Sequence, residues 1–223
     1  MIKDFIIDAE TLADKPNSIV VDVSVVVFDP DPTIVQSFDE LVASGRRFKI
    51  DLKSQKGVRL AQQQTIDWWK EQSQEARQHL APSDEDVTIE QATTEILEYL
   101  KKSGVDRWNS QGWCRGQSFD FPLFVDMISQ TYKTNYTRDI EPVMFWQQRD
   151  IRTAIEAYSL QRGTLMTPLR KGILDGFVAH NSIHDCVKDV IMLKTAQRYA
   201  YGLEEMPEEK DIDPTTVKKK RKK

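Results

Sequence analysis

Two apolar runs near the start of the chain have the composition of buried strands. Residues 5–7 form a short run that ends at Asp8, and residues 19–28 are rich in Val and Ile, which pack well on a pleated sheet. Residues 46–52 alternate apolar and charged side chains, the pattern of a strand with one buried face. The prolines within residues 29–32 interrupt strand geometry, because proline lacks a backbone donor. These segments predict three strands of an antiparallel meander.

The rest of the chain alternates between helical and extended patterns. Thr65 can cap a helix that carries Trp68 and Trp69, and Thr88 can cap the next one. Apolar side chains at helical spacing predict helices over residues 65–79, 88–104, 122–128, from about 150, and 184–201. Short apolar runs predict two further strands, residues 111–116 and 144–146. Three strands followed by alternating helix and strand indicate an α/β domain with a mixed sheet.

Length and composition indicate one domain followed by a tail. A chain of 223 residues can bury one sizeable core. After Gly202 the chain is acidic, contains Pro207 and Pro214, and ends in six consecutive basic residues. We therefore predict a single domain over residues 1–203 and a flexible tail over residues 204–223.

Charge and cysteine content narrow the class of protein. The chain has 31 basic and 35 acidic residues, with six of the basic ones together at residues 218–223. The remainder is therefore clearly acidic, which argues against a broad basic face but supplies carboxylates for metal ions. The basic end could recruit a polyanion by counterion release. Two cysteines are too few for a disulfide framework or a four-cysteine zinc site.

Membrane and export signals are missing from the sequence pattern. The longest uncharged apolar run, residues 23–28, is much shorter than a membrane span. The first residues lack the layout of a signal peptide. A cytoplasmic location without membrane association is expected.

Carboxylates at the ends of predicted elements are the candidates for chemistry. Asp8 and Glu10 follow the first strand one residue apart. Strand alternation puts both on one face, where a hard divalent cation could bind. Asp120 lies between aromatic residues at a predicted helix start, where it could be a metal ligand or a helix cap.

Two of the chain's three histidines lie close together, and each precedes an aspartate by five positions. The pairs are His180 with Asp185 and His184 with Asp189. A neutral imidazole can take a proton from water near pH 7. Because apolar neighbours such as Val187 place Asp189 beside the buried face of the helix, we favour His184 with Asp189 and rank His180 with Asp185 second.

Taken in order, these motifs resemble a known family. Asp8-x-Glu10, Asp120 after Phe119, and His184 five residues before Asp189 resemble the three motifs of the DEDDh branch of the DnaQ-like 3′–5′ exonucleases. The match spans nearly the whole predicted domain. Finer stretches resemble bacteriophage exonucleases of this branch: residues 51–57, 110–116 and 149–153. The resemblance implies an RNase H-like fold, with a mixed five-stranded sheet flanked by helices, and a phage enzyme would act in the host cytoplasm.

The resemblance also implies a mechanism. Four carboxylates would bind two Mg²⁺ or Mn²⁺ ions that activate water and stabilise the leaving 3′ oxygen: Asp8, Glu10, Asp120 and Asp189. His184 would accept the proton of the water, and Thr11 and Leu12 would contact the terminal nucleotide. The expected reaction releases nucleoside 5′-monophosphates from nucleic acid 3′ ends, with DNA as the preferred substrate.

Two positions depart from the family pattern. Many members have Asn four residues before the Asp of the second motif, where this chain has Gly116, and a larger residue where it has Ala9. Neither departure removes a metal ligand. Trp113, Phe119 and Trp146 could stack on bases or belong to the core.

Two alternatives remain open. An exoribonuclease or oligoribonuclease-like enzyme would use the same site, because the acids act on the phosphate. A catalytically silent nucleic-acid-binding module on this fold would release no nucleotide. The sequence gives no indication of protein partners or oligomeric state.

Overall fold

The core of the molecule is a mixed five-stranded sheet. The computed structural model describes residues 2–78 and 80–217. The strands follow the order β3–β2–β1–β4–β5 across the sheet: β1 (Asp4–Thr11), β2 (Val20–Phe28), β3 (Arg46–Lys49), β4 (Gly112–Cys114) and β5 (Gln148–Asp150). The first three strands are antiparallel, whereas β4 and β5 run parallel to β1. The predicted meander and the mixed five-stranded sheet are confirmed.

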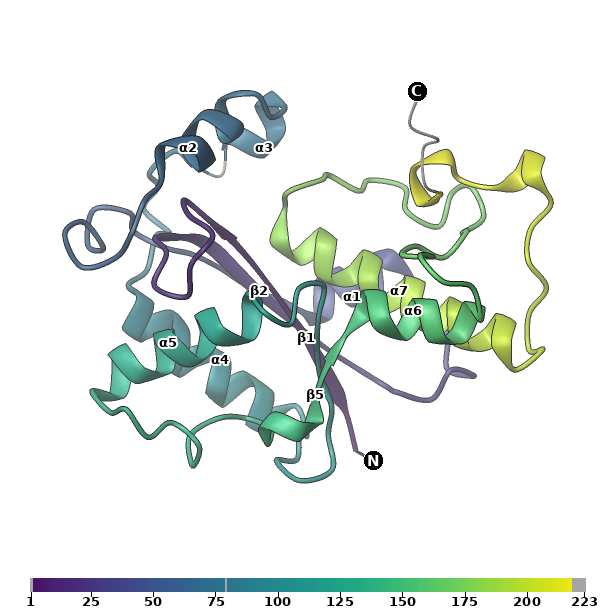
Figure 1. Cartoon of the computed structure of the whole chain (residues 1–223), viewed down its shortest axis with the longest axis horizontal. Helices are drawn as coiled ribbons and strands as arrows, with labels where there is room; N and C mark the ends of the chain where they lie inside the picture. Colours follow the sequence, from purple (N-terminus) through teal and green to yellow (C-terminus); the bar gives the residue numbers. More distant parts are fainter. Residues whose placement is uncertain (1, 79, 218–223) are drawn as a thin grey trace.

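Helices cover both faces of this sheet (Figure 1). They are α1 (Phe38–Ser44), α2 (Gln63–Lys70), α3 (Gln74–Gln78), α4 (Ile89–Lys102), α5 (Asp120–Tyr132), α6 (Ile151–Ser159) and α7 (Ser182–Ala200). The sequence pattern does not predict α1, although its capping box of Ser37 and Glu40 is a recognisable start signal. Among the described residues, no helix combines the length and the apolar character that a membrane crossing requires.

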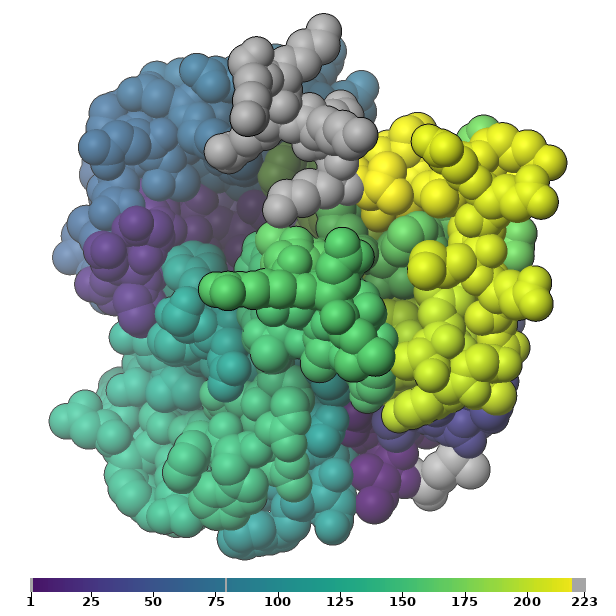
Figure 2. Space-filling model, turned by 45° about the vertical axis from the view of Figure 1, so that its right-hand side comes forward, coloured from purple at the N-terminus to yellow at the C-terminus, as the bar shows by residue number. Residues whose placement is uncertain are grey.

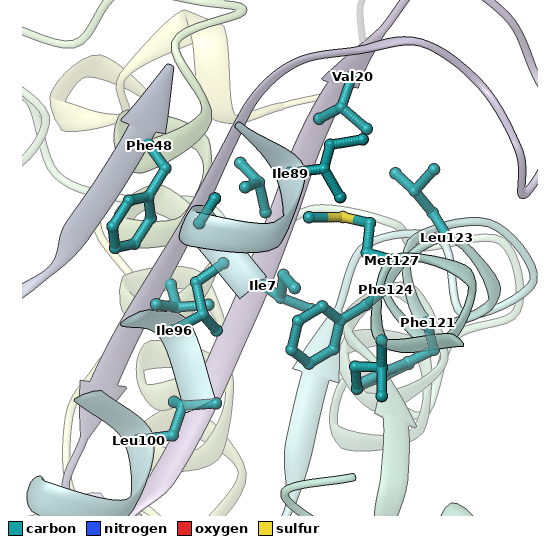
Figure 3. Close-up of a cluster of buried hydrophobic side chains, with 14 of the residues drawn as sticks. Ile7, Val20, Phe48, Ile89, Ile96, Leu100, Phe121, Leu123, Phe124 and Met127 are labelled. Atoms are coloured by element: carbon teal, nitrogen blue, oxygen red, sulfur yellow. The ribbon is translucent and has the colours of Figure 1, made fainter. Parts of the chain in front are cut away.

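Alternation along β1 divides the core into two layers. Phe5 and Ile7 point to the side covered by α4 and α5, and Figure 3 shows Ile7 beside Phe124 and Met127 of α5. Ile6 points to the opposite side, where it packs in the cluster formed with α1, α6 and α7. A strand that is buried on both faces is rich in β-branched residues, which explains why β1 and β2 are readable from the sequence.

Two predicted elements differ in the structure. Residues 144–146 are not a strand: Phe145–Gln147 form a 3-10 helix, and β5 begins at Gln148. Phe145 is 64% exposed, so its apolar character does not reflect burial in the sheet. The predicted helix over residues 65–79 is divided into α2 and α3, because the Ser73 hydroxyl accepts a hydrogen bond from the Ala76 backbone N–H and starts a new helix.

Part of the predicted tail is ordered against the domain. The Leu169 N–H donates to the hydroxyl of Thr216, at 3.0 Å, and the Asp213 N–H donates to the Leu169 carbonyl, at 2.8 Å. Thr216 is fully buried. A tail starting at residue 204 therefore does not describe the chain up to residue 217, because backbone pairing with a loop compensates for its polar composition. The basic residues 218–223 lie outside the described residues.

Candidate active site

The first two acids lie near the end of β1, opposite β2. Asp8 pairs with Ser24 and Glu10 with Asp22 in the antiparallel register. Asp22 is fully buried and accepts a hydrogen bond from Arg47 Nε at 3.1 Å. Burial, above all, raises the pKa of Glu10, and the nearby Asp22 raises it further. Carboxyl groups therefore crowd together at this end of the sheet.

Asp120 reaches the same place from the other face of the sheet. It is the first residue of α5, which has no side-chain N-cap, so Asp120 does not serve as the predicted cap. Its pKa rises to about 7, mainly because the carboxyl is buried, although a hydrogen bond with the Ala9 backbone opposes the rise. A Cβ on Gly116 would lie 3.4 Å from Asp120 Oδ2, an ordinary van der Waals distance, so this carboxyl lies beside the glycine. The contact with Ala9 directs Asp120 towards the segment between Asp8 and Glu10.

The start of α7 is fixed against β2 and carries the next acid. The hydroxyls of Ser182 and Ser24 share a hydrogen bond at 2.6 Å. Asp185 lies in the first turn of α7, where its carboxylate accepts hydrogen bonds from the His180 N–H at 2.9 Å and from Lys188 Nζ at 2.7 Å. These contacts hold His180 and Asp185 together.

His180 faces Glu10 across this cluster. Its Nδ1 is 3.7 Å from Glu10 Oε1. The interaction with that carboxylate raises the pKa of His180, and burial opposes this rise. The imidazole also meets two indole rings edge to face, with centroid distances of 4.9 Å to Trp68 and 6.2 Å to Trp69. Trp69 is buried and donates to the Thr11 carbonyl at 2.9 Å. Helix α2 thereby braces the imidazole from one side.

Three of these side chains are close enough to one another to hold a metal ion. One potential ligand atom each from Glu10, His180 and Asp185 lies within 4.8 Å of the other two. Burial raises the pKa of Asp8 well above its usual value, and the charges of Asp120, Glu10 and Asp185 add to this rise. Carboxylates that repel one another in a partly buried pocket fit hard divalent cations such as Mg²⁺ or Mn²⁺, which prefer oxygen ligands.

The structure does not bring the favoured pair, His184 and Asp189, into this arrangement. His184 Nδ1 accepts a hydrogen bond from the Val178 N–H at 3.0 Å. Its ring contacts Phe38 of α1 and Phe177, with centroids 5.2 and 6.3 Å away, and burial lowers the pKa of His184. The imidazole therefore belongs to the packing between α1 and α7.

Asp189 is held by an arginine. Arg115 Nε donates to both carboxylate oxygens of Asp189, at 2.7 and 2.8 Å, and Asp189 is only 2% exposed. Its charge is still close enough to contribute to the raised pKa of Asp120, after burial. The burial predicted for Asp189 is real, but a guanidinium accounts for it.

The other predicted contacts are divided between core and surface. Thr11 is 7% exposed and its hydroxyl donates to the Ala13 carbonyl, whereas Leu12 is half-buried. Trp113 is a core residue whose Nε1 donates to Asp4. Phe119 packs at the edge of the core, and Trp146 is 45% exposed.

Sequence reasoning missed Asp22, Trp68 and Arg115 as neighbours of the site. Asp22 is the one charged residue within the otherwise apolar and small-residue run of β2, a signal that could have marked it. Arg115 follows the buried strand β4 at its carboxyl end, where functional side chains of parallel strands collect. Trp68 has no such local signal.

Comparison with protein families gives a match over most of the chain. Residues 3–197 match the model described as the 3′-5′ exoribonuclease Rv2179c-like domain. The chain is also 51% identical over 225 aligned positions to a protein of Enterobacteria phage T4 named exodeoxyribonuclease, an alignment that covers 98% of this chain and 99% of that protein. The resemblance to phage exonucleases is thereby confirmed.

Solved structures of exonuclease I share the fold. Exonuclease I of E. coli in complex with a dT13 oligonucleotide superposes with a TM-score of 0.58 at 12% identity, over 91% of this chain and 42% of that one. Exonuclease I of Methylocaldum szegediense gives a TM-score of 0.55 at 10% identity, over 89% and 41%. A further E. coli structure is a zinc-bound complex with single-stranded DNA. The present chain spans less than half the length of these proteins, and the likeness confirms the predicted fold.

Proposed function

Because the chain belongs to the family of 3′-5′ exoribonuclease Rv2179c-like domains, we propose that it is a metal-dependent 3′–5′ exonuclease that releases nucleoside 5′-monophosphates from DNA. The observation that carries this proposal is the convergence of β1, α5 and α7 on one cluster of four carboxylates and an imidazole: Asp8, Glu10, Asp120, Asp185 and His180. The exodeoxyribonuclease of phage T4, at 51% identity, supports DNA as the substrate and the cytoplasm of an infected host as the place of action.

The residue assignment uses the second of the two histidine pairs. Asp185 takes the place of Asp189 as a ligand, since Asp189 is engaged by Arg115. His180 takes the place of His184 as general base, since its ring adjoins Glu10. The half-buried Leu12, at the end of β1, is suited to contact the terminal nucleotide, and Thr11 fixes the turn beside it.

In this proposal the carboxylates bind metal ions and His180 transfers a proton. Two divalent cations, Mg²⁺ or Mn²⁺, would supply water activation and stabilisation of the leaving 3′ oxygen when bound. The four carboxylates offer oxygen ligands from three separate elements, which fixes the position of the scissile phosphate relative to the sheet. His180 Nδ1 faces Glu10, so Nε2 is the nitrogen that takes the proton of the attacking water.

RNA is the second candidate substrate, because the family model is described as an exoribonuclease domain. The test is nucleotide release from matched DNA and RNA oligomers, with Mg²⁺ and with a chelator. We expect faster initial rates on DNA and no release without metal. Faster release from RNA would assign the enzyme to exoribonucleases. No release from either oligomer would leave a binding module.

A further inference from the structure

A groove lies beside the carboxylate cluster, along α6 and the loop that follows it. Its volume is about 510 Å³, and it is lined by Arg152 at the start of α6 and by Leu160, Arg162 and Leu165 beyond the helix end. In Figure 2 the bright-green residues of this region face the viewer at the centre of the molecule. The proposed function uses none of these residues.

One end of the groove adjoins the proposed active site. A Cβ on Gly116 would lie 3.8 Å from Arg152 Nη1 as well as 3.4 Å from Asp120 Oδ2, so the guanidinium and the carboxyl flank the same glycine. Leu165, at the groove wall, accepts a hydrogen bond through its carbonyl from Arg115 Nη1 at 3.1 Å. A strand whose 3′ end lies at the carboxylates can therefore continue directly into the groove.

The two arginines of the groove are available to a ligand. Neither Arg152 nor Arg162 makes an ion pair or a side-chain hydrogen bond with another described residue, and both are exposed. Ion pairs engage about half of the other described arginines: Arg47, Arg59, Arg107, Arg115 and Arg198. The acidic residue of the groove, Glu156, accepts a hydrogen bond from the Gly163 N–H at 3.0 Å. In a chain with a net charge of −4, this groove combines two unpaired cations next to an acidic centre.

The spacing and the apolar wall fit an extended polyanion. Arg152 lies in the first turn of α6, whereas Arg162 lies in the loop beyond the helix end, so the two arginines reach the groove from different segments. Leu160 is 93% exposed and has a left-handed backbone, with φ 53°, which holds its side chain out at the helix end. An exposed leucine between two arginines offers an apolar contact for a sugar or base.

We propose that this groove binds the phosphodiester backbone of the substrate strand on the 5′ side of the nucleotide being removed. Arg152 and Arg162 each contact one phosphate, and Leu160 packs against the nucleoside between them. The inference rests on the proposed exonuclease function and adds the path of the strand outside the carboxylate cluster.

The first experiment measures the salt dependence of binding. In an Asp8→Asn background that blocks hydrolysis, Arg152→Ala, Arg162→Ala and the double variant bind a fluorescein-labelled dT16 oligomer in Mg²⁺ buffer over a range of NaCl concentrations. Each lost phosphate contact should flatten the slope of log K against log salt by about 0.7, hence by about 1.4 for the double variant. Lys101→Ala is the matched control, because it removes one positive charge from α4 on the other face of the sheet.

The second experiment separates this inference from the proposed function. With Asp8 intact, the Arg162→Ala enzyme should hydrolyse a thymidine dinucleotide, which is too short for the groove, with the kcat and KM of the unsubstituted enzyme. Arg152 is kept in this experiment because its charge lowers the pKa of Asp120. The KM of the Arg162→Ala enzyme for dT16 should rise while kcat stays the same. Absence of hydrolysis by the unsubstituted enzyme would count against the exonuclease function itself.

Three outcomes would overturn the groove assignment while leaving the exonuclease function intact. They are an unchanged salt slope in the double variant, an equal change in Lys101→Ala, and an equal loss on the dinucleotide and on dT16. The last would place Arg162 in the cleavage site.

Discussion

His180 is positioned by its backbone as well as by its ring contacts. Its φ is 62°, in the left-handed region that non-glycine residues seldom occupy. The bond from its N–H to Asp185 stabilises that conformation, and Glu10 and Trp68 fix the imidazole. A strained residue held by several partners is typical of functional sites.

The first prediction compares the two histidines. His180→Ala should lower kcat by about 10²-fold or more, the usual loss for a general base, because no other imidazole adjoins Glu10 among the described residues. His184→Ala should leave kcat close to that of the unsubstituted enzyme, since its ring packs against Phe38 and Phe177. Single-turnover rates at saturating Mg²⁺ measure both.

Thermal unfolding serves as the control for this comparison, because His184→Ala removes the acceptor of the Val178 N–H and will lower Tm. A folded His184→Ala protein that loses activity as completely as His180→Ala would restore His184 as the base.

The second prediction concerns the titration of these imidazoles in the metal-free protein. The Glu10 carboxylate raises the pKa of His180, whereas burial lowers the pKa of His184. As the pH falls, His180 should therefore protonate first. Mg²⁺ should lower the pKa of His180, because a cation competes for Glu10, and leave His184 unchanged. NMR titration, with each resonance assigned by single substitution, gives both values; the opposite order of protonation would contradict this environment.

At the scale of elements, α7 is fixed to the sheet at two levels. At the start of the helix, the Ser182 hydroxyl shares a hydrogen bond with Ser24 of β2. Further along the helix, Asp189 accepts two hydrogen bonds from Arg115, which follows the end of β4. Because Asp185 lies between these attachments, its position relative to β1 depends on both. Asp189 is thus a positioning residue.

The third prediction follows from the buried ion pair. Asp189→Ala leaves the Arg115 guanidinium without its partner, and breaking such a pair costs roughly 3–5 kcal/mol of unfolding free energy. Replacing both partners, as in Arg115→Met/Asp189→Leu, should recover much of this loss. Urea denaturation measures the free energies. Asp185→Ala, by contrast, should abolish hydrolysis with a smaller loss of stability, since relief of repulsion with Asp8 offsets part of the loss of its bonds with the His180 N–H and Lys188.

The result that would contradict this assignment is an Asp189→Ala protein that is as stable as the unsubstituted one and inactive. Asp189 would then be a metal ligand, as the sequence alone indicates.

The sequence predicts those helices and strands whose burial follows from their local pattern of apolar and polar residues. Val- and Ile-rich β2 and the Thr88-capped α4 are of this kind, as are the acids of β1. The histidine pairing could not be decided in this way, because both pairs have the same spacing. Asp189 is paired with Arg115, 74 positions away in the sequence. The residues around Asp189 give no indication of this partner. The predicted strand at residues 144–146 is wrong because its aromatic residues suggest burial, whereas the structure exposes them.

At the scale of the whole molecule, the carboxylate cluster couples stability to pH. Burial raises the pKa of Asp120 from 3.8 to about 7. Between about pH 4 and pH 7, the carboxyl of Asp120 is ionised in the unfolded chain but protonated in the folded protein. The stability that this proton contributes is fully present below about pH 4 and is lost as the pH rises to about 7.

The fourth prediction tests this coupling. In EDTA, the unfolding free energy of Asp120→Asn should increase relative to that of the unsubstituted protein as the pH rises from 4 to 7, because the amide has no proton to lose. Mg²⁺ should then raise the Tm of the unsubstituted protein more at pH 8 than at pH 5, since cations bind ionised carboxylates. Denaturation and thermal scans at matched ionic strength provide the data; a difference between the two proteins that is independent of pH would show that Asp120 titrates normally.

The first strand and the last long helix both contribute to the carboxylate cluster, which sets when the enzyme becomes active during its own synthesis. At about 5–20 residues per second, translation from Asp8 to Asp185 takes roughly 10–35 s. A chain that stops before His180 lacks that imidazole and Asp185, to which we assign proton transfer and metal binding, and it lacks the helix that packs on β1 and β2. Nuclease activity therefore requires that α7 has been synthesised, and translation products that end before it should leave nucleic acid intact.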